Sequence, residues 1–158
     1  LSFSGQPRWI PPLKGRHQIN TLLEQIYDLH SAPDTSDFIE AAAQLSQHCS
    51  KRSLVIMISS IEGEDRHDLA KAVSLISQQH LVIVVSLRQP AIDEAINQPL
   101  HSLETSLQYC TATRLAQQRS EILTRLRNDR VIVIDTVPSH MHSAIIHEYL
   151  AMKRSGVL

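Results

Sequence analysis

Three continuous apolar runs alternate along the chain with segments whose apolar residues recur at helical spacing. The runs lie at 53–60, 81–87 and 131–135. Because each run is continuous rather than alternating, it is typical of a strand buried on both faces. The segments with helical spacing lie at 16–30, from Ser36 or Asp37 to about Cys49, and at 66–79, 103–128 and 139–154. Strands and helices in this order predict an α/β fold, whose mostly parallel sheet carries helices on both faces.

The remaining segments are interpreted from their prolines and from their lack of periodicity. Residues 1–4 are expected to form a strand and 7–12 a short edge strand, where proline is tolerated. Residues 88–102 are expected to be a loose connection. Ligands of parallel sheets bind at the carboxyl ends of the strands. We therefore expect functional residues within 59–65, 86–90 and 135–139.

Length and charge narrow the classes of function. The 158 residues suit one domain, spanning 1–158. A net charge of −1 gives no electrostatic reason to expect nucleic acid or an anionic membrane as partner. The longest apolar strand is far shorter than the roughly 20 residues that span a bilayer, so this segment is not expected to insert into membranes. The two cysteines, Cys49 and Cys110, lack metal or redox spacing and are expected to be buried thiols.

Some residue groups suggest catalysis or metal binding, but each has a plainer interpretation. A metal cluster is suggested by His140, His142 and His147. The first two lie two positions apart and do not share a helix face, so solvated histidines are the favoured interpretation. Asp65 and Asp68 flank His67 and are expected to serve a helix N-terminus, where negative charge is favourable. None of the four glycines belongs to a phosphate-binding loop motif.

Three further features concern the second half of the chain. Asp135 ends a strand at the expected ligand edge, so it is either functional or caps the turn into the last helix; the cap is favoured. A basic cluster suits a helix C-terminus, with a docking surface for an acidic partner as the alternative; its members are Arg114, Arg119, Arg125, Arg127 and Arg130. The apolar positions of 103–128 predict a stripe facing the core: Leu103, Leu107, Cys110, Leu115, Ile122 and Leu126.

Four ordered segments carry a resemblance to a known family. They are RSLVIMISSIEGED (52–65), HLVIVVSLRQP (80–90), VIVIDTVP (131–138) and EYLAMKRSGVL (148–158). Together they resemble the bacterial domain-of-unknown-function 58 proteins, which contain a von Willebrand factor A-like domain. The opening LSFSG and the run WIPPLKGR (9–16) are similar to the second strand and the proline-rich hairpin of that family. The resemblance implies a Rossmann-like von Willebrand factor A fold that lacks its first strand and helix here, an N-terminally truncated domain starting near the second strand.

The resemblance also implies a divalent-metal adhesion site. Such a site uses an Asp-x-Ser-x-Ser motif after the first strand, a hydroxyl on a second loop and an Asp after the fourth strand, all oxygen ligands that suit Mg²⁺. The first motif would lie before Leu1. The second-loop hydroxyl corresponds to Ser36, which Asp37 follows, and the fourth-strand Asp corresponds to Ser60, which has no carboxylate. The implied site is incomplete or degenerate, so no cofactor is certain and Mg²⁺ is a candidate only for the full-length protein.

The function implied by the resemblance is that of a non-enzymatic protein-interaction module. Its partner would be a MoxR-type AAA+ ATPase, and the pair would act in assembly or maturation of other proteins. The expected contact residues are Glu62, Glu64, Asp65 and Arg88. Full-length members often carry membrane helices ahead of this domain, which implies a parent protein anchored to the inner membrane with this domain in the cytoplasm. The alternative is a small-ligand or nucleotide-binding Rossmann-like enzyme domain, against which stand the missing glycine loops and nucleophile–base pair.

A truncated sheet has a structural consequence. In the fold that the resemblance implies, the first strand lies between the second and the fourth. Without it, the strand at 53–60 has an unpaired edge, and such edges recruit other chains. We therefore expect the sheet either to rearrange or to be completed by self-association.

Overall fold

The computed structural model describes residues 1–3, 8–11, 18–28, 37–61, 66–128 and 131–156. Its centre is a three-stranded parallel sheet in the order β1 (Leu54–Ser59), β2 (Leu81–Leu87) and β3 (Ile132–Thr136). In the register of the sheet, Ser59 lies beside Ser86 and Ser86 beside Asp135. The polar residues at the carboxyl ends of the strands therefore lie at one edge of the sheet, as the sequence predicts.

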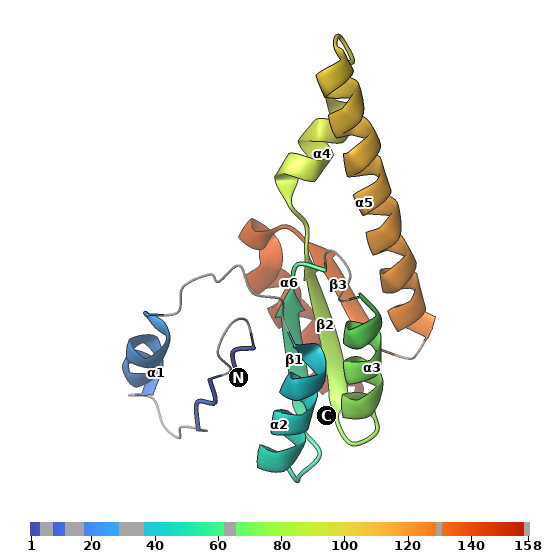
Figure 1. Ribbon diagram of the computed structural model, residues 1–158. Coiled ribbons are helices and arrows are strands. Elements are labelled where there is room, and N and C mark those ends of the chain that lie inside the picture. The colour runs from blue at the N-terminus through green and yellow to red at the C-terminus, as the bar shows by residue number, and fades with distance from the viewer. Residues whose placement is uncertain (4–7, 12–17, 29–36, 62–65, 129–130, 157–158) are drawn as a thin grey trace.

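Helices cover both faces of this sheet (Figure 1). On one face lie α2 (Phe38–His48), α3 (Arg66–Ser77) and the C-terminal part of α5 (Leu103–Asn128), and on the other lies α6 (Met141–Ser155). Because side chains alternate along a strand, β2 supplies both cores. Val82 and Val84 pack with the first group of helices, and Ile83 and Val85 pack with α6. The predicted α/β architecture is confirmed.

Most predicted elements are confirmed, with small differences at their ends. β2 and α5 have the predicted bounds, and α2 begins as predicted after Asp37, whose carboxylate accepts a hydrogen bond of 2.8 Å from the Glu40 backbone N–H. The last predicted helix is preceded by a short 3-10 turn at Pro138–His140. It ends at Gly156, whose positive φ suits glycine at a helix C-terminus.

The prediction of a loose connection at 88–102 is wrong. Residues Pro90–Asn97 form helix α4, which packs on α5. Pro90 falls within the segment expected to be a loose connection, but proline is also well suited to the first turn of a helix, where its missing N–H costs nothing. The proline alone therefore does not distinguish a connection from the start of a helix.

The prediction that the whole apolar stripe of α5 faces the core is also wrong. Leu103 and Leu107 are 77% and 60% exposed, whereas Ile122 and Leu126 are buried. A helix of 26 residues is about 39 Å long and extends well beyond strands of five to seven residues. Its N-terminal part and α4 together project from the sheet as an arm, residues 90–116 (Figure 1). Cys110 lies on this arm and is exposed, so its prediction as a buried thiol is wrong, while Cys49 is half-buried.

At the N-terminus the described residues form a bridge rather than regular strands. Ser2 and Arg8 exchange backbone hydrogen bonds of 2.9 and 3.0 Å as an isolated antiparallel bridge. The guanidinium of Arg8 also donates 2.6 and 3.2 Å hydrogen bonds to the Asp28 carboxylate, just after α1 (Gln18–Ile26). Of the strands predicted at 1–4 and 7–12, the described residues 1–3 and 8–11 form only this bridge, and residues 4, 7 and 12 lie outside the described part of the chain. Among the described helices, none is long and apolar enough to cross a membrane.

Leucine-to-alanine substitutions at the two ends of α5 should differ in their effect on stability. Leu126→Ala removes a fully buried side chain and should lower the free energy of unfolding by about 2–5 kcal/mol. Leu107→Ala, on the same helix but exposed, should change it by less than about 0.5 kcal/mol. Urea denaturation followed by circular dichroism measures both values. Equal losses would mean that the arm packs against the rest of the chain.

Candidate functional site

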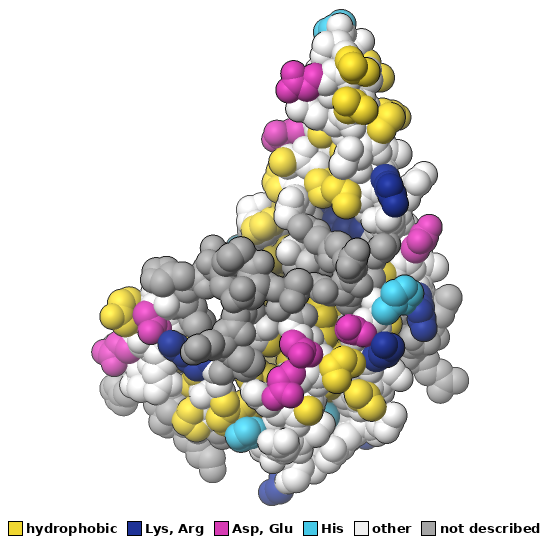
Figure 2. Space-filling model, viewed as in Figure 1, with side chains coloured by type: hydrophobic (Ala, Val, Ile, Leu, Met, Phe, Trp, Pro, Cys, Tyr) yellow, Lys and Arg dark blue, Asp and Glu magenta, His cyan; other side chains and the backbone are white. Residues whose placement is uncertain are grey.

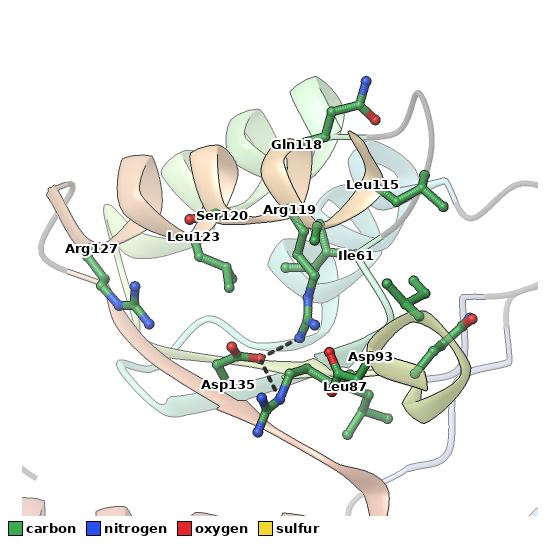
Figure 3. A pocket seen from close by; sticks show the side chains of 14 residues that line it. Ile61, Leu87, Asp93, Leu115, Gln118, Arg119, Ser120, Leu123, Arg127 and Asp135 are labelled. Atoms are coloured by element: carbon green, nitrogen blue, oxygen red, sulfur yellow. Dashed lines mark hydrogen bonds and ion pairs between the residues drawn. The ribbon is translucent and has the colours of Figure 1, made fainter. Parts of the chain in front are cut away.

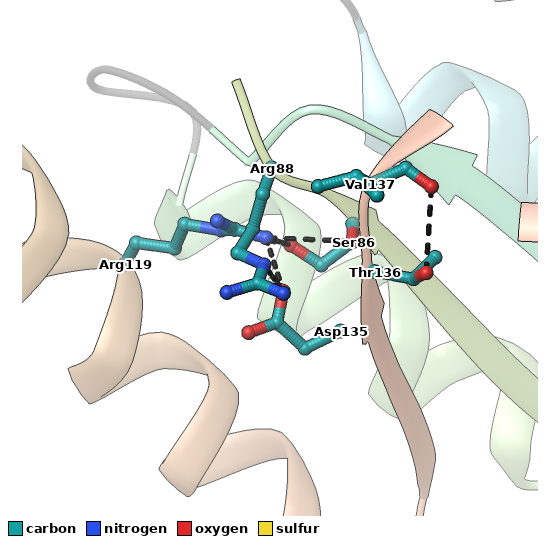
Figure 4. A network of polar contacts seen from close by, with 6 residues as sticks. All are labelled: Ser86, Arg88, Arg119, Asp135, Thr136 and Val137. Atoms are coloured by element: carbon teal, nitrogen blue, oxygen red, sulfur yellow. Dashed lines mark hydrogen bonds and ion pairs between the residues drawn. The ribbon is translucent and has the colours of Figure 1, made fainter. Parts of the chain in front are cut away.

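The polar residues at the carboxyl edge of the sheet are brought together by one arginine of α5. Ser86 of β2 and Asp135 of β3 are neighbours in the sheet, and Arg119 reaches both from the helix above them (Figure 4). Its Nε and Nη2 atoms donate hydrogen bonds of 3.0 and 2.7 Å to the Ser86 hydroxyl. Nη2 also forms an ion pair with the Asp135 carboxylate. We call this arrangement the Arg119 clasp.

Burial makes the clasp a structural constraint. Ser86 is fully buried, and the Arg119 side chain is only 15% exposed. A guanidinium removed from water needs a paired carboxylate and hydrogen-bond acceptors, because otherwise the loss of hydration outweighs any packing gain. Asp135 and Ser86 supply both. The clasp therefore joins α5 to two strands and fixes the position of the helix over the sheet edge.

A second arginine lies on the solvent side of the same carboxylate. The Nε atom of Arg88 is 4.0 Å from Oδ1 of Asp135, and the Arg88 side chain is 43% exposed. Its backbone N–H donates a 2.8 Å hydrogen bond to the carbonyl of Thr136, which continues the pairing of β2 with β3 past the last strand residue. Arg88 thus has a fixed backbone and an accessible guanidinium. At this distance and exposure, its ion pair with Asp135 contributes little to stability.

The clasp forms one wall of a cavity of about 230 Å³ between the sheet edge, α4 and α5 (Figure 3). Three arginines and two acids carry its charge, leaving a surplus of one positive charge: Arg88, Arg119, Arg127, Asp93 and Asp135. Its apolar wall includes Ile61 and Leu123. Of its described lining residues, none is a histidine, cysteine or lysine. The arrangement can bind a carboxylate or another small anion, and its lining offers no nucleophile beside a base.

Of the residues predicted to contact a partner or to belong to a metal site, the structure describes Arg88, Ser60 and Asp37. Arg88 lines the cavity, and Ser60 is exposed directly after β1. Ser36, Glu62, Glu64 and Asp65 lie outside the described residues. The structure therefore brings Arg88 into the candidate site and leaves the acidic part of the predicted surface untested.

The described residues do not fit the metal site that the resemblance implies. The Asp37 carboxylate already accepts the capping hydrogen bond of α2, and Ser60 provides only a hydroxyl. No group of three or more His, Cys, Asp or Glu suitable for a metal ion occurs among the described residues, so the predicted histidines form no such group there. These oxygens alone are too few for a divalent cation, which prefers six or more ligands including water.

The structure changes the interpretation of Asp135 and of the basic cluster. Asp135 pairs with Arg119 rather than capping the turn, since neither the 3-10 turn nor α6 has a side-chain cap. Arg125 and Arg127 do lie in the last turn of α5, as expected of cations near a helix C-terminus. Arg119 is different because it continues the register of Leu115 and Ile122. A charged residue within an apolar stripe is the signal that could have predicted a buried ion pair.

Removing the carboxylate of the clasp should cost stability that removing the outer arginine does not. Asp135→Asn removes the carboxylate that pairs with the partly buried Arg119 and should lower the free energy of unfolding by about 1–3 kcal/mol. Arg88→Gln should lower it by less than about 0.5 kcal/mol.

A double-mutant cycle with Arg119→Gln, measured by urea denaturation, isolates the pair itself. The Arg119–Asp135 coupling should exceed the Arg88–Asp135 coupling. Equal coupling energies for the two pairs would show that Arg119 holds Asp135 no more strongly than Arg88 does.

Comparison with known proteins agrees with the resemblance seen in the sequence. The model of the family described as "Protein of unknown function DUF58" matches residues 1–132. The match includes β1, β2, the arm and Arg119, whereas most of β3, with Asp135, lies beyond it. No curated protein and no solved structure matches the chain. Because the matched residues make up well over half of its length, the chain belongs to the DUF58 family.

Proposed function

We propose that the chain is a non-enzymatic protein-interaction module with a von Willebrand factor A-like fold, which binds its partner at the carboxyl edge of the sheet. Two observations support the fold assignment. The parallel order β1-β2-β3 with helices on both faces is one half of a doubly wound sheet. The polar residues also gather at the carboxyl edge, where such sheets bind their ligands.

The observation that carries the proposal is that the two arginines beside the Asp135 carboxylate have different roles. Arg119 neutralises the carboxylate from the buried side. Arg88 is therefore not needed to neutralise Asp135. Its guanidinium is exposed, and its backbone is held by a hydrogen bond to β3. A guanidinium matches the two oxygens of a carboxylate, so Arg88 is suited to an acidic side chain of a partner.

This mode of binding needs no metal ion. A metal adhesion site would use a cation to receive a partner's carboxylate, whereas Ser60 stands where such a site has an aspartate. The surplus positive charge of the cavity can serve the same purpose. The partner that the resemblance suggests is a MoxR-type AAA+ ATPase, with assembly or maturation of other proteins as the shared task.

Substitution of Arg88 should weaken binding of that ATPase. With the purified ATPase of the same organism, biolayer interferometry should show about a tenfold higher Kd for Arg88→Gln than for the unaltered chain, because the guanidinium pairs with a carboxylate of the partner. Arg52→Gln is the matched control. Arg52 is also exposed but lies before β1, at the opposite end of the sheet, and its substitution should leave the Kd unchanged.

Two results would contradict the proposal in different ways. Equal Kd values for the Arg88 and Arg52 variants would exclude the proposed contact surface. Absence of binding by the unaltered chain would exclude the ATPase as its partner.

A second candidate function rests on the cavity itself. Three arginines around a small volume favour an anionic ligand, as in a nucleotide-handling enzyme domain. However, cavities for organic ligands usually measure about 300–1,000 Å³, and this one is about 230 Å³. The cavity therefore suits a carboxylate better than a whole nucleotide.

A thermal-shift experiment separates the two functions. A ligand raises the Tm only if it binds the folded chain. The interaction-module proposal expects no change of Tm with millimolar ATP, GTP or NAD. A rise that Arg127→Gln removes would favour the nucleotide-binding alternative, because Arg127 lines the cavity and has no part in the clasp.

A further inference from the structure

The arm carries an open apolar groove beyond the carboxyl edge of the sheet. The groove has a volume of about 700 Å³ and runs between α4 and the N-terminal part of α5. Alanines and leucines make up much of its lining, chiefly Ala91, Ala95, Ala112, Leu103, Leu107 and Leu115. Leu103 and Leu107 are largely exposed, as is Leu100 in the turn between the helices. Figure 2 shows apolar side chains gathered along the arm.

The position of the groove explains why no part of the described chain covers it. α4 packs on α5 and on no other helix to a comparable extent, and the arm projects past the sheet. A contiguous exposed apolar surface on a projecting element is typical of a binding site for another protein. Scattered single leucines would need no such explanation.

The groove is also preformed. The turn at the start of α5 is held by a reciprocal capping interaction, in which the Ser102 hydroxyl accepts from the Thr105 N–H at 3.2 Å and the Thr105 hydroxyl accepts from the Ser102 N–H at 3.1 Å. A 3.0 Å hydrogen bond between the side chains of Gln98 and Gln108 joins the turn to the helix. The C-terminal part of α5 is held in the core by Leu126 and at the sheet edge by the Arg119 clasp. A rigid groove loses little entropy on binding.

Charge indicates what kind of occupant the groove takes. Within the arm, residues 90–116, the chain has three acids, Asp93, Glu94 and Glu104, against one arginine, Arg114, which leaves a net charge of −2 with histidine neutral. Glu104 lines the groove itself. The field of the arm is therefore negative, and it attracts a cationic partner while opposing the pairing of two arms.

From these observations we infer that the groove is a docking site for an amphipathic helix of a partner protein, with an apolar stripe flanked by lysine or arginine. The apolar stripe packs against the alanines and leucines of the groove, which is how amphipathic helices bind grooves in other proteins. The basic flanks meet Glu104 and the negative field of the arm. This inference concerns a different surface from the carboxyl edge and does not depend on the function proposed there.

A pair of model peptides tests both parts of the inference. The first is a fluorescent peptide of about 18 residues, made of leucine and lysine, with its leucines at helical spacing. The second has glutamate in place of every lysine. Fluorescence anisotropy with the whole chain should show binding of the Leu/Lys peptide that is at least about tenfold tighter than that of the Leu/Glu peptide.

Variants of the chain locate the binding site. Leu103→Ser combined with Leu107→Ser should weaken binding of the Leu/Lys peptide by about tenfold or more, because the apolar walls are lost. Leu75→Ser is the matched control, since Leu75 is an exposed leucine of α3 far from the arm in the chain, and it should leave binding unchanged. Glu104→Lys keeps the apolar walls and should reduce the preference for the Leu/Lys peptide.

Three outcomes would overturn the inference. Equal binding of the Leu/Lys peptide to the chain with and without the two serine substitutions would show that the groove is not its site. Equal binding of both peptides would remove the charge argument. A dimer in sedimentation equilibrium that the serine substitutions abolish would make a second copy of the chain the occupant. Circular dichroism of each variant confirms that a loss of binding is not a loss of fold.

Discussion

A partly buried guanidinium that must have a counter-charge is the constraint on which the rest of the structure depends. Arg119 lies among apolar positions of α5 and finds its partners on two different strands, Ser86 and Asp135. An unpaired cation at this depth would cost more than a surface salt bridge contributes. The helix is therefore held where its arginine meets the sheet edge. Its direction past that point determines where the arm and the groove lie.

The same constraint separates the charged residues that stabilise the fold from those that stay accessible to a partner. The clasp uses the inner arginine and the only carboxylate that β3 offers, which leaves Arg88 accessible at the edge. Beyond the edge, the arm is acidic and apolar. The cavity and the groove adjoin at Ile92 and Leu115, the former suited to a carboxylate and the latter to a cationic helix. Such an arrangement favours a fixed orientation of a bound partner.

Much of the fold could be predicted from local pattern. The continuous apolar run of β2, the period of α5 and the cap at Asp37 each have a cause within a few residues, and the structure confirms them. The exposure of Leu103 and Leu107 had no such local cause. A helical period shows which residues share a face, but whether another element covers that face depends on how far the helix extends past the sheet.

The candidate site, too, could be predicted only where its features depend on nearby residues in the sequence. That Arg88 lies at the carboxyl edge of the sheet follows from its place directly after a strand. The pairing of Arg119 with Asp135 joins residues on a helix and a strand, and only the register of β2 beside β3 brings the carboxylate under the helix. Pro90 was ambiguous for a different reason, because the same residue suits a turn and the first turn of a helix.

Hydrogen–deuterium exchange of α5 tests the central claim, that the Arg119 clasp anchors this helix to the sheet edge. Peptide-resolved exchange would be compared between the unaltered chain and Asp135→Asn. The account predicts faster exchange of the amides of α5 around Arg119 in the variant, because loss of the ion pair weakens the link between that segment and the sheet, with a smaller change in α6 on the other face of the sheet. Unchanged exchange around Arg119 would contradict it and would show that apolar packing alone holds the helix in place.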